Sequence, residues 1–582
     1  MDETVLKVSD LHVAFPHDGE YREAVKGVSF TVRRGTTLGI VGESGSGKSV
    51  TSLAIMGLLP KTAQVTGSWS DMRGHSSMIF QEPMTSLNPV QRCGAQVEEM
   101  LLAHEQVSRK EARRRTLQLF EEVMLPRPEK IYRSYPHEIS GGQKQRVMIA
   151  MALICHPDLL IADEPTTALD VTVQKTILDL LRSLQNKYHI GIIFITHDLG
   201  VIAQIADEVA VMYHGEIVEQ GPAHQLLHHP QHPYTKGLLA CRPPLDSRPR
   251  RLLTVKDFLE MENSATKMEH SAHAPNDSQF HTINSQPNYY ETTQPHPNNS
   301  QSSIHNSQLE NNSPLLRVRD LQVTYPLETT ILGKVKKELK AVNELSFDIY
   351  RGETVGLVGE SGCGKSTLGR AILQLLAHSS GSIEYDGRSL DNLTPADTKA
   401  LRRKMQIIFQ DPYSSLNPRI TIGEAIAEPL IVHNSSITDQ TSNTRISKTA
   451  IKEKVLNLMQ QVGLEPEWYN RYPHEFSGGQ RQRVCIARAL ILQPELVICD
   501  ESVSALDVSV QAQVLNLLND LKERHGYTYL FITHDLSVVK FLSDRILVMQ
   551  QGRIVEQGPA DQLFAHPQHP YTQRLLAAIP KV

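Results

Sequence analysis

Two adjacent carboxylates follow a short apolar run at two places in this chain of 582 residues. Asp163 and Glu164 form the first pair, and Asp500 and Glu501 form the second. A short, fully apolar run is typical of a buried parallel strand, and sheets of this kind bind ligands at the carboxyl ends of their strands. We expect each Asp to complete the shell of a magnesium ion and each Glu to orient or deprotonate a water. The alternative is that each Glu only caps a strand. Two adjacent carboxylates are then unfavourable, because no cation offsets the repulsion between their charges.

A glycine-rich loop lies upstream of each acidic pair. Residues 42–49 read GESGSGKS and residues 359–366 read GESGCGKS, each between an apolar run and a helical pattern. In this context the pattern predicts a phosphate loop, with the Lys at the outer phosphates and the last Ser at magnesium. The predicted nucleotide contacts are Gly42, Glu43, Ser44, Gly45, Ser46, Gly47, Lys48 and Ser49, and Gly359, Glu360, Ser361, Gly362, Cys363, Gly364, Lys365 and Ser366.

A second anion-binding feature, Ser-Gly-Gly-Gln, opens a helical pattern in each half of the chain. A hydroxyl and side-chain-free N–H groups at a helix start face the positive end of the helix dipole, which carries about half a charge. The residues of this predicted anion site are Ser140, Gly141, Gly142, Gln143, Ser477, Gly478, Gly479 and Gln480.

Polar residues at further strand ends complete the predicted site. His197 and His534 each lie 34 positions after the strand-end Asp, and we interpret them as γ-phosphate contacts that keep the Glu and its water in line. Gln81 and Gln410 each end an apolar run before a loop that contains proline, so the amide can reach the metal and its water.

Two aromatic residues precede the phosphate loops. Phe15 and Tyr325 are each followed by a proline. An aromatic ring at this place could stack on adenine, and the alternative is an ordinary core aromatic.

Equal spacing in both halves indicates a duplicated domain. The signature Ser and the strand-end Asp are 23 positions apart in each copy. The distance from the first loop Gly to the Gln is 39 in the first half and 51 in the second. We therefore expect the first half to lack a peripheral turn-and-helix piece that resembles residues 385–403.

A polar segment separates the halves. Residues 254–314 are rich in Asn, Ser, Gln, His and Pro, a composition that cannot bury enough apolar surface to fold. The predicted organisation is a first domain over 1–253, a flexible linker over 254–314 and a second domain over 315–582. Residues 434–444 are similarly expected to form an exposed loop.

Composition excludes several classes of protein. The net charge of -5 gives no reason to expect nucleic acid as a partner, and no apolar run approaches the about 18 residues of a membrane span. The six cysteines are scattered without a C-x-x-C pair, which argues against a disulfide or zinc framework. The histidines crowded over residues 224–232 are expected to be solvent-exposed and not zinc ligands.

With all these motifs in order, each half resembles an ATP-binding-cassette (ABC) nucleotide-binding domain. The resemblance covers residues 4–242 and 315–580. It implies an α/β fold of two tandem P-loop NTPase domains, each with a RecA-like core, an antiparallel β piece and an α-helical subdomain. It also implies head-to-tail pairing within the chain, with residues 42–49 facing 477–480 and residues 359–366 facing 140–143. Both ATP sites are complete and are expected to hydrolyse ATP. Ser502, where the first copy has Pro165, is a small departure.

The segment Gln-His-Pro-Tyr-Thr at 231–235 and 568–572 is similar to the tail of ATPases that serve peptide and nickel importers. This resemblance implies a peripheral ATPase at the cytoplasmic face of the inner membrane. Its expected partners are two permease subunits and an extracytoplasmic solute-binding protein. The cysteine-bearing tail of some such proteins is missing here, so no iron–sulfur cluster is expected.

Two alternatives remain. Fused cassette proteins that act on ribosomes are expected to carry a basic linker, whereas Lys267 is the only Lys or Arg between residues 261 and 314. Fused sugar-importer ATPases usually have a degraded second signature, and residues 477–480 are intact. The preferred function is ATP-driven import of peptides, such as dipeptides, oligopeptides or glutathione.

Overall fold

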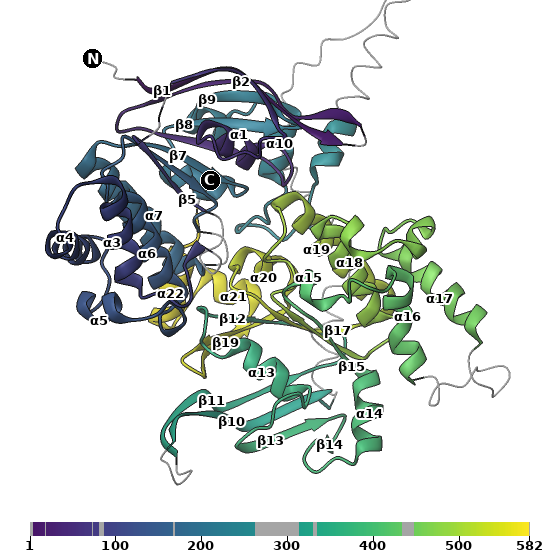
Figure 1. The fold of residues 1–582 in the computed structure, drawn as a ribbon. Coiled ribbons are helices and arrows are strands. Elements are labelled where there is room, and N and C mark those ends of the chain that lie inside the picture. Colours follow the sequence, from purple (N-terminus) through teal and green to yellow (C-terminus); the bar gives the residue numbers. More distant parts are fainter. Residues whose placement is uncertain are drawn as a thin grey trace, which may run out of the picture.

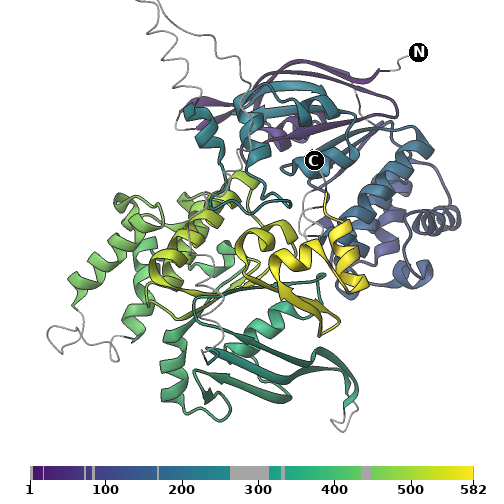
Figure 2. The ribbon, with the colours of Figure 1, turned by 180° about the vertical axis from the view of Figure 1, so that it is seen from behind.

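The computed structural model describes residues 4–17, 19–70, 72, 74–80, 86–166, 169–261, 313–329, 335–433 and 447–580. Two similar α/β units follow one another along the chain, and Figures 1 and 2 show them from opposite sides. Gln81 and the predicted exposed loop at 434–444 lie outside the described residues, as do residues 262–312 of the predicted linker.

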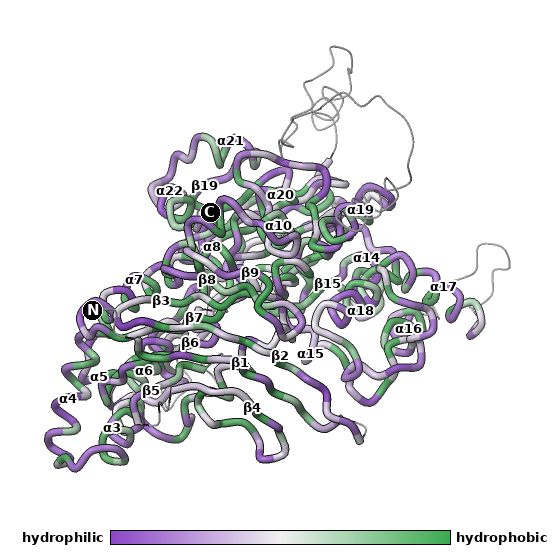
Figure 3. The backbone as a smooth tube through the Cα atoms, turned by 90° about the horizontal axis from the view of Figure 1, so that it is seen from above, coloured by the Kyte–Doolittle hydropathy of each residue, from purple (hydrophilic) through white to green (hydrophobic). Residues whose placement is uncertain are grey.

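A six-stranded sheet forms the centre of the first unit. Its order is β5-β6-β7-β3-β8-β9, and all neighbours are parallel except β8 and β9. The strands β3, β6 and β7 are fully buried, which explains their largely apolar sequences. Figure 3 shows long hydrophobic stretches along β7 and β8. The bounds are β3 Thr37–Val41, β5 Ser76–Ile79, β6 Leu159–Asp163, β7 Gly191–Thr196, β8 Glu208–Tyr213 and β9 Glu216–Pro222.

The second unit repeats this sheet in the order β15-β16-β17-β12-β18-β19, again with an antiparallel edge strand β19. The repetition confirms the predicted α/β fold of two tandem domains. The bounds are β12 Thr354–Val358, β15 Met405–Ile408, β16 Leu496–Asp500, β17 Thr528–Ile532, β18 Arg545–Gln550 and β19 Arg553–Pro559.

An antiparallel sheet packs beside each parallel one. The first has the order β2-β1-β4 and the second β11-β10-β13-β14. The bounds are β1 Thr4–His17, β2 Glu20–Arg33 and β4 Gln64–Trp69, and β10 Leu316–Thr329, β11 Val335–Ile349, β13 Ser380–Tyr385 and β14 Arg388–Ser389.

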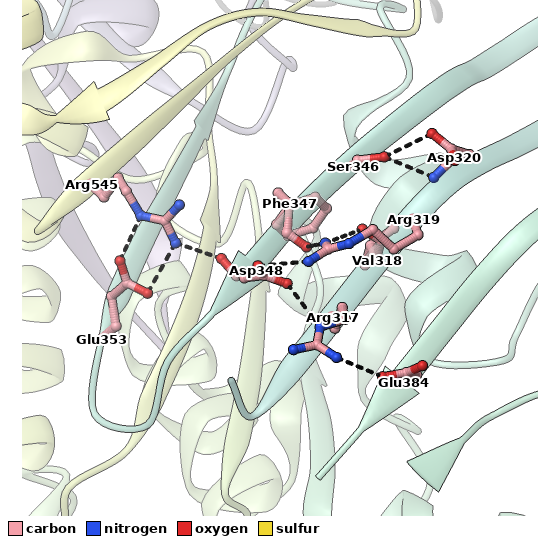
Figure 4. A network of polar contacts seen from close by, with 10 residues as sticks. All are labelled: Arg317, Val318, Arg319, Asp320, Ser346, Phe347, Asp348, Glu353, Glu384 and Arg545. Atoms are coloured by element: carbon pink, nitrogen blue, oxygen red, sulfur yellow. Dashed lines mark hydrogen bonds and ion pairs between the residues drawn. The ribbon is translucent and has the colours of Figure 1, made fainter. Parts of the chain in front are cut away.

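The first residue of β18 and the first residue of β8 each form an ion pair. Arg545, the first residue of β18, makes a bidentate pair with Glu353 at 2.8 and 3.2 Å and also donates to the carbonyl of Asp348 (Figure 4). In the first half, Glu208 begins β8 and accepts from Arg33 at 2.8 Å. Both strands thus begin with a charged residue in an ion pair, but Arg33 lies on β2 whereas Glu353 lies in the turn between β11 and β12.

Helices cover the parallel sheets and form a separate layer beside them (Figure 1). In the first half they are α1 Lys48–Ile55, α3 Cys93–His104, α4 Arg109–Glu122, α5 Pro128–Arg133, α6 Gly141–Leu153, α7 Val171–Tyr188, α8 Leu199–Ile205, α9 Ala223–His228 and α10 Pro233–Ala240. In the second half they are α13 Lys365–Ile372, α14 Pro395–Lys404, α15 Pro412–Ser415, α16 Ile422–His433, α17 Lys448–Gln461, α18 Gly478–Leu490, α19 Val508–His525, α20 Leu536–Leu542, α21 Ala560–Ala565 and α22 Pro570–Ala577.

The chain between the phosphate loop and Gln410 is longer than the chain between the phosphate loop and Gln81. The additional residues form a local piece of structure in the second half. In the second half, β14 and α14 lie between β13 and β15, whereas residues 70–75 alone join β4 to β5 in the first half. The added helix lies next to β15, at the outer edge of the parallel sheet.

The segment after α10 crosses to the second half. Leu252 is buried there, Arg248 donates to the carbonyl of Phe541 at 3.0 Å, and Arg250 pairs with Glu523 at 2.8 Å. Residues 255–261 are helical, and Val255 is buried against Gly237. The predicted linker start at residue 254 is therefore wrong for residues 254–261, because apolar side chains there find a packing surface that composition alone does not reveal.

Candidate functional site

The first acidic pair lies at the end of β6, as its sequence predicts. Asp163 is 5% exposed, and burial raises its pKa despite a hydrogen bond from Ser49. The backbone of Glu164 has a φ of 47°, an uncommon left-handed conformation for a non-glycine residue, and its N–H donates to the carbonyl of Ile195. The turn thus aims two neighbouring carboxylates in different directions.

His197 lies beside the Glu at the end of the neighbouring strand β7. Its Nδ1 is 3.3 Å from Oε1 of Glu164. Burial lowers the pKa of His197, but the hydrogen bond and the charge of Glu164, together with Asp507 and Asp198, outweigh it and raise the pKa. The imidazole can therefore hold a proton next to the carboxylate.

Lys48 begins α1 and turns back over the phosphate loop. Its Nζ donates to the carbonyls of Gly42 at 2.7 Å and Glu43 at 2.8 Å. Burial lowers the pKa of Lys48, while the charges of Glu164, Asp507 and other carboxylates oppose this shift. A Cβ at Gly42 would lie 2.2 Å from the carbonyl of Met212, so only glycine fits at the loop entrance.

The second half builds the same site with more direct contacts. Ser366 donates to Asp500 at 2.8 Å, and Gln410 donates through Nε2 to Glu501 at 2.8 Å. Lys365 lies 3.9 Å from Glu501, and its Nζ also donates to the carbonyls of the loop entrance.

The charge state of Glu501 follows from these neighbours. The oxygen of Glu501 that accepts from Gln410, Oε2, also lies 3.7 Å from Nδ1 of His534. Burial raises the pKa of Glu501, but the nearby imidazole of His534 and the charge of Lys365 lower it overall. A carboxylate held in its charged form is suited to accept a proton from water.

Each Ser-Gly-Gly-Gln segment forms a capping box at an exposed helix start. The Oγ of Ser140 accepts from the N–H of Gln143, whose side-chain oxygen accepts from the N–H of Ser140 at 3.0 Å. Ser477 and Gln480 repeat this arrangement at the start of α18. The N–H groups of the Gly residues between them are left for a ligand to bind. The pairing of each segment with the opposite phosphate loop stays a prediction.

The two halves meet near the acidic centres, through residues that have no predicted role. The charge of Asp507 acts on Lys48 and His197 of the other half. Asp507 makes no side-chain cap to α19, whereas Asp170 caps α7 by accepting from Val173 at 3.0 Å. Ala-Leu-Asp follows each acidic pair at the same spacing, and this repetition was the sequence signal that could have identified Asp170 and Asp507.

A cavity of about 120 Å³ lies between these segments and is lined from both halves. Its walls include His197 and Arg242 from the first half and His534 and Ile579 from the second. The interface between the halves therefore contains a cavity that reaches both His197 and His534.

Both predicted adenine contacts are placed outside the acidic centre. Phe15 lies on β1 and is partly buried against the core of the first antiparallel sheet. Tyr325 lies on β10 and is 37% exposed. An adenine-stacking role stays a prediction for both.

The sequence model of the ABC transporter family matches residues 25–167 and 342–504, which together make up more than half of the chain. The chain belongs to the ABC transporter family. A model described as the C-terminal region of oligopeptide/dipeptide transporters matches residues 218–267 and 555–582 of this ABC protein. As an ABC transporter ATP-binding subunit, it is an ATPase that works with membrane permease subunits.

Curated relatives match this ABC protein over almost its whole length. The glutathione import ATP-binding protein GsiA of Escherichia coli K12 is 46% identical over 99% of this chain and 89% of the relative. The protein of the same name from Pectobacterium atrosepticum is 45% identical over 100% of this chain and 90% of the relative. A solved dimeric ATP-binding cassette, MJ0796 bound to ADP and Pi, covers 42% of this chain and 98% of its own, at 27% identity and a TM-score of 0.37.

The ABC protein is peripheral to the membrane, as an importer ATP-binding subunit. Among the residues that the structure describes, none of the helices is both long enough and apolar enough to span a bilayer.

Proposed function

We propose that the chain hydrolyses MgATP at two sites between its halves and thereby drives the import of glutathione or short peptides. The observation that carries the solute class is the 46% identity, over 99% of the chain, to a protein named for glutathione import. The match of both Gln-His-Pro-Tyr-Thr segments to the oligopeptide/dipeptide transporter region supports the same class.

Magnesium fits the residues present. Oδ1 of Asp163 is buried without a hydrogen-bond partner, which is costly for a carboxylate unless a cation is bound. Ser49 and Asp163 would hold the ion in one half, and Ser366 and Asp500 in the other, with Gln81 and Gln410 reaching it from their loops. Bound magnesium would neutralise charge on the transferred phosphoryl group.

The protein residues then divide the remaining work. Lys48 and Lys365 leave the loop carbonyls to contact the outer phosphates. Glu164 and Glu501 take the proton of the attacking water, and His197 and His534 hold them in line with the γ-phosphate. The Ser-Gly-Gly-Gln segment of each half closes over the nucleotide of the other.

The wider assembly contains two permease subunits and an extracytoplasmic solute-binding protein, with this chain at the cytoplasmic face of the inner membrane. Closure around ATP would move the loops of Gln81 and Gln410 and so pass the motion to the permeases. A role on ribosomes is disfavoured because Lys267 is the only Lys or Arg between positions 261 and 314.

Uptake of labelled glutathione tests this function. A strain that lacks the gene is complemented with the wild-type chain or with Glu164→Gln/Glu501→Gln. We expect uptake with the wild type alone. Competition by unlabelled dipeptides and tripeptides defines the solute range, and uptake that is equal in the deleted and complemented strains would contradict the proposal.

A further inference from the structure

In both halves, the tyrosine of the Gln-His-Pro-Tyr-Thr segment contacts the phosphate loop. The N–H of Glu43 donates to the hydroxyl of Tyr234 at 3.0 Å, and the N–H of Glu360 donates to the hydroxyl of Tyr571 at 3.0 Å. These partners are 191 and 211 residues apart in the sequence. A local sequence motif cannot connect residues so far apart, and neither tyrosine takes part in the steps proposed for ATP hydrolysis.

The other residues of the segment hold the tyrosine in place. In the first half, the carboxylate of Glu219 on β9 accepts from the N–H groups of Gln231 and His232 at 2.8 and 3.1 Å. The Nδ1 of His232 then accepts from the N–H of Tyr234, and Pro233 begins α10. The carboxylate of Glu219, the cap from His232 and the proline at the helix start together fix the orientation of the Tyr234 ring.

The second half repeats every contact. Glu556 accepts from the N–H groups of Gln568 and His569 at 2.8 and 3.0 Å, and His569 caps Tyr571 at 3.2 Å. Both tyrosine rings are buried, with Tyr234 at 0% and Tyr571 at 2% exposure. Burial raises the pKa of both phenols, so each remains a neutral hydroxyl.

The peptide that each tyrosine binds is clamped from its other side by the loop lysine. Gly42 and Glu43 share one peptide group, whose oxygen accepts from Lys48 and whose N–H donates to Tyr234. When Lys48 turns to the outer phosphates, the oxygen loses this partner. The tyrosine hydroxyl then remains as the contact that holds the entrance of the loop.

We propose that Tyr234 and Tyr571 are positioning residues for ATP binding, whose hydroxyls fix the first peptide of each phosphate loop from the Gln-His-Pro-Tyr-Thr segment. The segment is thus a structural support of the nucleotide site. The proposal rests on the ATPase activity and not on the identity of the imported solute.

The test compares the full-length wild type with Tyr234→Phe/Tyr571→Phe. The phenyl rings keep the packing, so only the two hydrogen bonds are removed. Because the loop binds phosphate equally in the ground and transition states, we expect the KM for ATP to rise about five- to tenfold. The kcat should stay within about twofold, and the Kd of ATP should rise in parallel with KM.

Tyr213→Phe provides the matched control. The Tyr213 ring packs against Tyr234 with centroids 4.1 Å apart, but the structure shows no hydrogen bond from its hydroxyl within the described ranges. This variant should keep the wild-type KM. An unchanged KM and Kd in Tyr234→Phe/Tyr571→Phe would overturn the proposal, as would a fall in kcat and melting temperature without a rise in KM. If the wild-type chain hydrolyses ATP but does not restore glutathione uptake, that result contradicts the proposed solute and not the role of the tyrosines.

Discussion

Asn516 clasps the backbone of Leu252 with both ends of its side-chain amide. Its Oδ1 accepts from the Leu252 N–H and its Nδ2 donates to the Leu252 carbonyl, both at 2.9 Å. Asn516 is 4% exposed, so the pair is buried between the two halves. Asp179 occupies the same ninth position of α7, and it is exposed. The clasp therefore exists in one half alone and attaches the first domain to α19 of the second.

Asn516→Asp is expected to release this segment. A carboxylate cannot donate to the Leu252 carbonyl and would place a charge against it in a buried site, at a cost of about 2–3 kcal/mol. Amide hydrogen exchange of residues 242–261 should become faster. Asp179→Asn, at the matching position of α7, should leave that exchange unchanged, and equal protection in both variants would show that the clasp does not hold the segment.

The paired substitution Glu164→Gln/Glu501→Gln should abolish turnover while preserving ATP binding. Loss of a positioned general base typically lowers the rate about 10²- to 10⁴-fold, and the phosphate loops are untouched. Steady-state phosphate release and equilibrium binding of ATP provide the measurements. Glu129→Gln, a substitution at a side chain 61% exposed on α5, is the control. Wild-type turnover in the paired variant would refute the role given to both carboxylates.

His197 should stabilise the first domain more in mildly acidic than in alkaline solution. Burial opposes its protonation, but Glu164 raises the pKa in the folded state. A raised folded pKa gives stability that is fully present below the unfolded pKa of about 6.5 and lost as pH rises through the folded value. The melting temperature of His197→Gln should therefore fall further below the wild type at pH 6 than at pH 9. A gap of the same size at both pH values would mean that the proton is not shared with Glu164.

The sequence was sufficient to predict the fold and which candidate site residues lie close together, because their signals are local. A phosphate loop needs a fixed order of glycines, and a strand-end Asp-Glu pair needs an apolar run before it. These patterns located Lys48, Asp163 and Glu164 without any knowledge of tertiary contacts.

The remaining features depend on contacts distant in sequence. Tyr234 meets Glu43 across 191 residues, and the clasp of Leu252 depends on Asn516 across 264. The apolar residues Leu252 and Val255 were the local sign that packed structure continues past residue 253. Burial of a few side chains on another domain leaves little periodicity in a sequence so short.

Disulfide crosslinking across the ATP site tests most directly whether the two halves clasp nucleotide between them. Ser44→Cys and Ser477→Cys are combined in the Glu164→Gln/Glu501→Gln chain, with each single cysteine substitution as a control. We predict rapid crosslinking with ATP and magnesium and little without them. Crosslinking that never appears, at any concentration of ATP, would contradict the head-to-tail arrangement of the two sites.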